Sequence, residues 1–308
     1  MNNKCLKSAV IHRPMGLLLV LFVTVMALPA GPLRAESAAG ASPGCLGCHA
    51  ASADKPVHAI LRTRHGRIES GDAGCVSCHG ASAEHAADPV RKAPEMTFGP
   101  GSSASPEAQV AACQGCHKSG KLMFEHGSVH YDEDLTCTSC HNLHVQRDPV
   151  LDESTQADVC YTCHARQRTQ ANLPYRHPIK EGRTQCSDCH NPHGSTTPFS
   201  LNEPTLNDTC YRCHAEKRGP YLFEHAPAAE DCSTCHEAHG AVNEDLLKAR
   251  GPFLCQQCHA AAFHPSVVYS GTGLPSRQPN QNMLGKNCLN CHSQVHGSNH
   301  PSGSTLAR

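Results

Sequence analysis

The motif Cys-x-x-Cys-His occurs ten times in the 308 residues and uses twenty of the twenty-one cysteines. The first cysteines are Cys45, Cys75, Cys113, Cys137, Cys160, Cys186, Cys210, Cys232, Cys255 and Cys288. The second cysteines are Cys48, Cys78, Cys116, Cys140, Cys163, Cys189, Cys213, Cys235, Cys258 and Cys291. The motif histidines are His49, His79, His117, His141, His164, His190, His214, His236, His259 and His292. This motif is the attachment signature of c-type haem. Two thiols form thioethers and the adjacent imidazole binds the iron, so ten covalently attached haems are predicted.

Other interpretations of the cysteines fit this pattern poorly. A structural zinc site pairs one Cys-x-x-Cys with a second pair or with spaced histidines, and needs no histidine directly after each pair. A disulfide framework has no reason to repeat a two-residue gap ten times. A thioredoxin-like site uses a single Cys-x-x-Cys on a βαβ pattern, which is absent here.

The N-terminus, residues 1–35, is predicted to be a secretory signal peptide. Lys4, Lys7 and Arg13 supply positive charge, residues 15–28 are apolar, and small residues lead to a cleavage site after Ala35. The apolar stretch is shorter than a comfortable membrane span. Export also fits the chemistry, because c-type haem is attached outside the cytoplasm.

An uncleaved N-terminal anchor is the alternative to a signal peptide. Leu33 stands three residues before the predicted cut, where a small residue is usual. Cleavage would remove Cys5, the one cysteine outside the motifs, and leave 273 residues. These carry 22 basic and 27 acidic residues, a net charge of −5 before haem is added. This balance does not favour nucleic-acid binding.

The composition predicts that haem forms the core. The predicted mature chain has about 27 residues for each haem, Trp is absent, and only 4% of residues are aromatic. The 24 glycines and 22 prolines favour loops. We therefore expect a multihaem cytochrome c fold that is mostly coil, with short α-helices and almost no β-structure. Ser105 and Pro106 should cap a helix before Cys113, and Asn207 and Asp208 are predicted to begin a similar turn before Cys210.

The motifs alternate in the position of the next histidine, and this divides the chain into five units of two motifs. In each unit a lone histidine lies well beyond the first motif, and a close histidine comes soon after the second motif. The units begin at Cys45, Cys113, Cys160, Cys210 and Cys255. Repeats of this kind pack on their neighbours, which predicts an elongated row of haems. The predicted division of the mature chain is an N-terminal half, 36–185, and a C-terminal half, 186–308.

Histidines outnumber the motifs enough to supply every iron with a second ligand. The chain has 24 histidines, whereas only Met96, Met123 and Met283 survive the predicted cleavage, so bis-His ligation and low potentials are expected. The predicted second ligands are His65, His85, His130, His144, His177, His193, His225, His239, His264 and His296. His126 and His300 are the alternatives to His130 and His296, and His58 is not expected to bind iron.

The close histidines are expected to bind a different haem from the one their own motif holds. His144, His193 and His239 each come three residues after a motif histidine. A residue three positions along a short turn cannot reach the opposite face of the same porphyrin. These side chains are therefore predicted to link neighbouring units.

Several sequence segments resemble those of a known family. They are CSDCHNPHGS (186–195), NDTCYRCHAEKRGP (207–220), EHAP (224–227), LCQQCH (254–259) and CLNCHSQVHGSNHPSG (288–303). These segments resemble those of the decahaem periplasmic cytochromes of outer-membrane electron conduits, which are the Mtr type of metal-reducing bacteria. Relatives act in phototrophic iron oxidation and extracellular dimethyl sulfoxide reduction. The resemblance covers about residues 45–303 and is most specific in the second half.

The resemblance implies a non-catalytic electron carrier located in the periplasm and associated with the outer membrane. Its partners would be an outer-membrane β-barrel protein that encloses it, an extracellular multihaem cytochrome, and a periplasmic or inner-membrane cytochrome donor. A free periplasmic electron shuttle is the alternative in the same class. A multihaem enzyme of the nitrite or hydroxylamine type needs an open iron position, which the supply of histidines argues against.

Overall fold

The structure is a computed structural model that describes residues 44–49, 57–67, 72–259 and 287–306. Contacts group the chain into Met1–Ala41 and Ser42–Arg308, and every described residue belongs to the second group. The predicted boundaries after residues 35 and 185 stay predictions. The predicted signal peptide and His264 lie outside the described residues.

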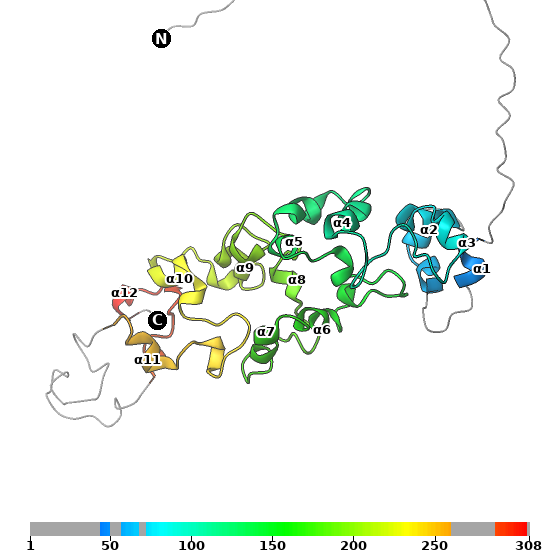
Figure 1. The fold of residues 1–308 in the computed structure, drawn as a ribbon. Helices are drawn as coiled ribbons and strands as arrows, with labels where there is room; N and C mark the ends of the chain where they lie inside the picture. Colours follow the sequence, from blue (N-terminus) through cyan, green and yellow to red (C-terminus); the bar gives the residue numbers. More distant parts are fainter. Residues whose placement is uncertain (1–43, 50–56, 68–71, 260–286, 307–308) are drawn as a thin grey trace, which may run out of the picture. The chain divides into compact units, whose positions relative to one another are not determined.

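Short helices joined by coil make up most of the described chain (Figure 1). The α-helices are α1 Cys45–His49, α2 Asp72–His79, α3 Ala83–Ala87, α4 Pro106–Gln114, α5 Val129–Asp132, α6 Gln156–Tyr161, α7 Ala165–Gln170, α8 Cys186–Cys189, α9 Leu206–Tyr211, α10 Ala226–Glu230, α11 Gly251–Cys255 and α12 Gly303–Leu306. The 3-10 turns are η1 Val57–Arg62, η2 His65–Arg67, η3 Gly120–Gly127, η4 Cys137–Ser139, η5 Pro149–Leu151, η6 Pro198–Ser200, η7 Ala215–Lys217, η8 Cys232–Thr234, η9 Glu244–Leu246 and η10 Cys288–Asn290. In the described ranges, no helix has both the length and the apolar character that a bilayer crossing needs.

β-structure in the described residues is limited to one two-stranded sheet and three isolated bridges. Strands β1 (Phe223–Glu224) and β2 (Gly297–Ser298) pair antiparallel, with Phe223 opposite Ser298. The bridges join Tyr175 to Ala241, His190 to Leu201 and His236 to Leu247. The predicted class, a multihaem cytochrome of coil and short helices with almost no β-structure, is confirmed in these features.

Helix starts agree with the capping signals of the sequence in one case and differ in another. Helix α4 begins as predicted, with Pro106 at its first position and the Ser105 hydroxyl accepting from Ala108 N. Helix α9 begins earlier than predicted, because Thr205 is its N-cap and accepts from Asp208 N at 3.0 Å. Asp208 lies three residues after the cap and accepts from the Thr205 hydroxyl at 2.6 Å. The prediction that Asn207 and Asp208 begin this turn was therefore wrong.

The two motifs of each unit pack against each other, and this contact repeats along the described chain. The contacting pairs are α1 with α2, α4 with η4, α6 with α8, α9 with η8, and α11 with η10. One pair belongs to each unit. The repeat that motif spacing indicates is therefore also a repeat of packing.

Buried side-chain amides fix the register of the two motifs within a unit. Gln156, which opens α6, accepts from Ser187 N at 3.1 Å beside the second motif. Asn207 does the same in the next unit, where its carbonyl accepts from Cys232 N at 2.8 Å and its amide donates to the carbonyls of Ala228 and Ala229. An apolar residue at either position would leave a backbone N–H without this partner, which is costly in a buried place.

The polypeptide alone has too few buried apolar side chains for a core. Among the described residues, only Val110, Ala171, Leu201 and Ala241 are buried hydrophobic residues, whereas eight polar or charged residues are buried. Large apolar side chains such as Val90, Phe199 and Leu222 are strongly exposed. Burial of apolar surface is the main favourable term in folding, so the fold needs another apolar component. Covalently attached porphyrins would supply it.

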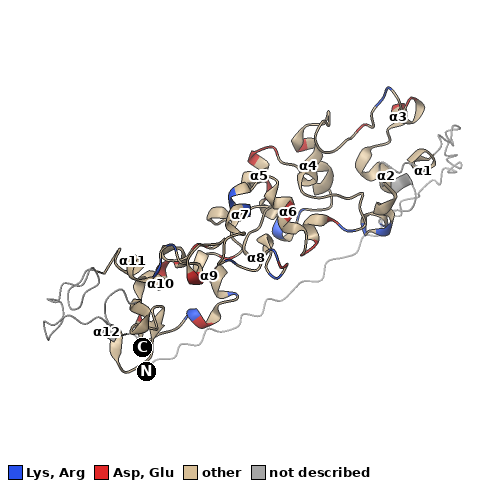
Figure 2. Cartoon of the chain, turned by 90° about the horizontal axis from the view of Figure 1, so that it is seen from below, with Lys and Arg blue, Asp and Glu red and all other residues tan. Residues whose placement is uncertain are grey.

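Charged residues are interspersed along the described ribbon (Figure 2). Short blue and red segments alternate and most of the ribbon is uncharged. Several opposite charges are paired, as in Arg147 with Asp152 at 2.7 Å and Arg176 with Glu181 at 2.8 Å. This distribution gives no support to a nucleic-acid-binding surface on the described part.

Gly240→Ala should destabilise the protein, because Gly240 has φ +155° and a Cβ there would meet the backbone carbonyl of Gln170. The neighbouring bridge, in which Ala241 N donates to Tyr175 O at 2.8 Å, holds this loop in place. We expect a loss of about 1–3 kcal/mol, measured as a lower guanidinium midpoint by circular dichroism of the haem-loaded protein. Gly127→Ala is the matched control, since a Cβ there meets no atom within 4 Å. Equal midpoints for the two variants would contradict the prediction.

Candidate haem-binding sites

Each motif from Cys113 onward forms one closed turn. The N–H of the motif histidine donates to the carbonyl of the first cysteine at 2.9–3.0 Å in all eight of these motifs. The motifs at Cys45 and Cys75 lie inside α1 and α2. None of the twenty motif cysteines is in a disulfide. The turn places two thiols and one imidazole together, as thioether attachment and iron ligation require.

Nine motif histidines each face one of the predicted second ligands. The distances between ring centres lie between 5.8 and 6.4 Å. The pairs are His49–His85, His117–His65, His79–His144, His164–His130, His141–His193, His214–His177, His190–His239, His259–His225 and His236–His296. The structure thus brings together nine of the ten predicted second ligands with motif histidines.

The separation of the rings fits a metal between them. Rings in direct van der Waals contact would lie about 3.5–4 Å apart, so these rings do not touch face to face. A metal-bound imidazole nitrogen lies about 2 Å from the metal and its ring centre about 1 Å further, which puts two opposed rings about 6 Å apart. The spacing therefore matches one iron with an imidazole on each side.

The pairs connect different units by a simple rule. The lone histidine of one unit faces the first motif of the next unit, as His130 faces His164. The close histidine of a unit faces the second motif of the preceding unit, as His193 faces His141. The first unit has no predecessor, and its close histidine, His85, faces His49 of its own unit. His190 faces His239, so His190 and His193 belong to different pairs.

Hydrogen bonds at Nδ1 orient many of these rings. His79, His85, His130, His177, His190 and His236 bond through Nδ1 to the backbone carbonyls of Met96, Lys92, Pro192, Ala238, Phe199 and Asp245, at 2.7–2.9 Å. A carbonyl can only accept, so Nδ1 carries the proton and Nε2 keeps a lone pair. Metal-binding histidines commonly show this second interaction, which fixes tautomer and ring orientation.

Burial favours the neutral, metal-binding form of several second ligands. It is the largest cause that lowers the pKa of His65, His144, His193, His239 and His296 below the ordinary value, and neighbouring histidines lower it further in each case. A neutral imidazole has the free lone pair that binds iron. Burial thus favours the form that ligation needs in these five side chains.

Three described histidines, which belong to neither a motif nor a pair, have other environments. The Nε2 of His126 bonds to the Gln114 side-chain oxygen at 2.8 Å. The Nδ1 of His300 accepts from Ser302 N at 3.1 Å, which leaves the proton on Nε2. His58 is exposed. These placements favour His130 over His126 and His296 over His300 as ligands.

Thiols of consecutive motifs are neighbours, and the contact alternates. In the second, third and fourth units a hydrogen bond joins the two first cysteines, which raises the pKa of one thiol (Cys113, Cys160, Cys210) and lowers that of the other (Cys137, Cys186, Cys232) to about 7. Between units, burial and then charged neighbours, among them a cysteine of the next motif, raise the pKa of Cys78, Cys140, Cys189 and Cys235. Thioethers do not titrate, so the relevant result is proximity between consecutive motifs.

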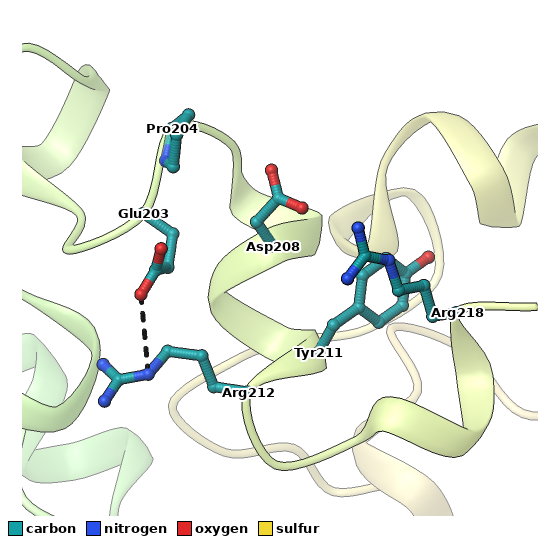
Figure 3. Close-up of a pocket in the computed structure, with 6 residues that line it drawn as sticks. All are labelled: Glu203, Pro204, Asp208, Tyr211, Arg212 and Arg218. Carbon is teal, nitrogen blue, oxygen red and sulfur yellow. Dashed lines mark ion pairs between the residues drawn. The ribbon is translucent and has the colours of Figure 1, made fainter.

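An open depression of about 400 Å³ lies beside the motif at Cys210. Its lining residues are Glu203, Pro204, Asp208, Tyr211, Arg212 and Arg218. Figure 3 shows Arg212 turned toward Glu203, with which it pairs at 3.5 Å. Guanidinium groups are good partners for carboxylates such as haem propionates. The depression contains no cysteine or histidine.

Three families match parts of the chain. Residues 177–219 and 225–264 match the family described as doubled CXXCH motif. Residues 75–156 match the family of cytochrome c-type protein NrfB-like, and residues 30–80 match cytochrome c554 and c-prime.

Two curated proteins are similar to the chain. Multiheme cytochrome MtrA of Shewanella baltica (strain OS185) is 48% identical over 269 residues, which cover 86% of this chain and 80% of that protein. Cytochrome c-type protein NrfB of Escherichia coli O6:H1 is 35% identical over 69 residues, which cover 21% of this chain and 36% of that protein.

Proposed function

The chain belongs to the MtrA family of multihaem c-type cytochromes, and we propose that it carries electrons across the outer membrane through ten bis-His haems. The Mtr-type resemblance seen in the sequence is confirmed, and with it haem binding and electron transport. The nine histidine pairs about 6 Å apart are the observation that carries the finer proposal. Bound haem supplies one-electron redox chemistry.

Each Cys-x-x-Cys-His motif would hold one haem through its two cysteines and its histidine. The second ligand would come from the facing ring of each pair. The nine pairs include every motif histidine except His292 and every predicted second ligand except His264. We propose that these two form the tenth pair. Such a pair would lie within a single unit, as the His49–His85 pair does.

The contacts between motifs support haems arranged in sequence order. First cysteines form a hydrogen bond within a unit, as in Cys113 with Cys137, and second cysteines of consecutive units are near enough to interact electrostatically, as in Cys189 with Cys213. Each attached haem would then lie beside the haems of the motifs before and after it. Such a row of ten would be elongated and longer than the hydrocarbon core of a bilayer, about 30 Å.

A conduit requires a partner that shields this chain from lipid. A polypeptide with backbone polar groups in loops can lie at membrane depth only when protein encloses it, and the described chain is mostly coil. The family resemblance implies an outer-membrane β-barrel as that partner. It also implies a periplasmic or inner-membrane cytochrome donor and an extracellular multihaem cytochrome, and we propose that the protein acts in the periplasm at the outer membrane.

Histidine ligation on both sides of each iron favours an electron carrier over an enzyme. A nitrite- or hydroxylamine-converting haem keeps one iron position open for substrate. Here the geometry gives each of nine motif histidines a facing imidazole. The remaining alternative is a periplasmic shuttle, which would share this ligation and differ in having no barrel partner.

His193→Ala should make one haem high-spin, namely the haem attached at Cys137 and Cys140. The reason is that the His193 ring faces His141, whereas His190 faces His239. Magnetic circular dichroism of the oxidised protein should show high-spin signal from about one tenth of the haem. His126→Ala is the matched control and should remain fully low-spin. A structure in which the haem at Cys186 lost its ligand would contradict the assignment.

Co-expression with its barrel partner should let the cytochrome move electrons across a lipid membrane. The measurement is reduction of an external acceptor by a dye sealed inside liposomes, which we expect only when cytochrome and barrel are both present. The cytochrome alone should be inactive, because its polar backbone cannot enter lipid. Near-equal co-purification with the barrel is the accompanying result. A cytochrome that binds no barrel and exchanges electrons equally well in solution would support the shuttle.

A further inference from the structure

His141 differs from the other oriented histidines in the chemistry of its Nδ1 partner. Six histidines bond at Nδ1 to neutral backbone carbonyls, as His190 does with Phe199 O at 2.8 Å. The Nδ1 of His141 instead bonds to the carboxylate of Asp148, with Oδ2 at 2.7 Å. A carboxylate raises the basicity of the histidine to which it bonds. His141 is therefore the more strongly electron-donating ligand.

The carboxylate of Asp148 is held in place and shielded from water. Its Oδ1 accepts from Asn142 N at 3.2 Å and from Val150 N at 3.3 Å, and Asp148 is the N-cap of η5. These bonds leave Oδ2 for His141. The Asp148 side chain is only 10% exposed and that of His141 is 28% exposed. Charge-assisted hydrogen bonds are stronger than neutral ones, and limited exposure reduces screening by solvent.

The same loop position in the next two units uses carbonyls in place of this carboxylate. In the third unit, His190 Nδ1 and Asn191 N bond to the carbonyls of Phe199 and Ser200. In the fourth unit, His236 Nδ1 and Glu237 N bond to those of Asp245 and Leu246 in the same way.

Those four carbonyl-bearing residues all have φ between 52° and 60°. The second unit has a loop two residues shorter, and one Asp148 side chain makes both contacts, to His141 and to Asn142. The second unit therefore differs from the next two in a shorter loop, in which one carboxylate side chain replaces two backbone carbonyls.

One other carboxylate lies near a motif histidine without this geometry. Glu216 approaches His214 Nδ1 at 3.7 Å, and both side chains are more than half exposed. That distance is too long for a hydrogen bond, and solvent screens exposed pairs. Glu216 therefore offers no equivalent of the Asp148 contact.

We infer that Asp148 is a tuning residue that gives the haem at Cys137 and Cys140 a lower reduction potential than the haems of His79, His190 and His236. Negative charge passed to the iron through His141 stabilises the ferric over the ferrous state, since hydrogen bonds to the axial ligands help to set haem potentials. Reduction adds one electron, and the Nδ1 proton stays within the hydrogen bond, moving toward His141. This inference rests on the proposed ligation of iron by His141.

The test is a potentiometric titration of the full haem-loaded chain and its Asp148→Asn variant. Asparagine keeps the shape and removes the charge. At the potential where this haem is half reduced in the wild type, the ferrous to ferric ratio should rise about tenfold in the variant, which is about 59 mV for one electron. Asp152→Asn is the matched control, since Asp152 pairs with Arg147 at 2.7 Å and does not contact His141. In the control variant, the ferrous to ferric ratio at the same potential should change less than threefold.

Equal titration curves for wild type and Asp148→Asn, or a shift no larger than that of Asp152→Asn, would overturn the inference. If Asp148→Asn fails to accumulate with its haems, Asp148→Glu keeps the carboxylate and should retain the low-potential step. The near-infrared magnetic circular dichroism of the wild type should also resolve one haem whose imidazole ligand has partial imidazolate character, and a uniform band would count against the inference. The His141→Ala variant tests the ligation separately from the tuning by Asp148. If all haem in that variant stayed low-spin, the proposed ligation of iron by His141 would be contradicted.

Discussion

Opposed imidazoles from different units are the interaction on which the rest of this structure depends. His130 and His164 belong to consecutive units, as do His193 and His141 in the reverse direction. Eight of the nine pairs join two units in this way, so the iron held by each of them would tie two units together. The described residues contain only four buried hydrophobic side chains, far fewer than a domain of this size needs to offset chain entropy. Folding and haem ligation are in this view one process, as metal binding and folding are in other small-core proteins.

The direction of the links also explains how such an array can end. In an internal unit, the lone histidine faces a motif histidine of the next unit, and the close histidine faces one of the preceding unit. In the unit that begins at Cys45, His85 instead faces His49 of the same unit. Terminal repeats of solenoid proteins likewise need atypical caps. A fold built this way can change length by whole units while keeping every iron coordinated, because each added unit brings as many ligands as it consumes.

The sequence predicted the residues of the candidate sites better than it predicted their partners. Motif spacing identified the two motifs of each unit, and the counting of histidines selected side chains that now lie opposite motif histidines, although iron ligation stays a prediction. The capping signal of Ser105 and Pro106 was correct because it depends on neighbouring residues alone. The predicted start of α9 was wrong. Asn207 is a residue type that often caps helices, but here its side-chain oxygen accepts a hydrogen bond from Cys232 N. Pairings across units depend on packing that a single sequence does not specify.

The Asp148 contact was missed for a related reason, although a signal was present. The pair Asp148–Pro149 comes after the close histidine of the second unit, and an aspartate before proline is typical of a turn start. Nothing in that local pattern says that the second carboxylate oxygen faces His141. The contact becomes evident from the three equivalent loops in the structure. After His141 a short loop supplies a carboxylate, whereas after His190 and His236 a longer loop supplies two carbonyls.

This substitution has a consequence for the whole array. A carbonyl orients the ligand without charge, whereas a carboxylate orients it and also changes the energy of the electron on the iron. If Asp148 tunes its haem as inferred, loop length in this repeat would set potential as well as geometry, and a row of similar motifs would hold haems with different potentials.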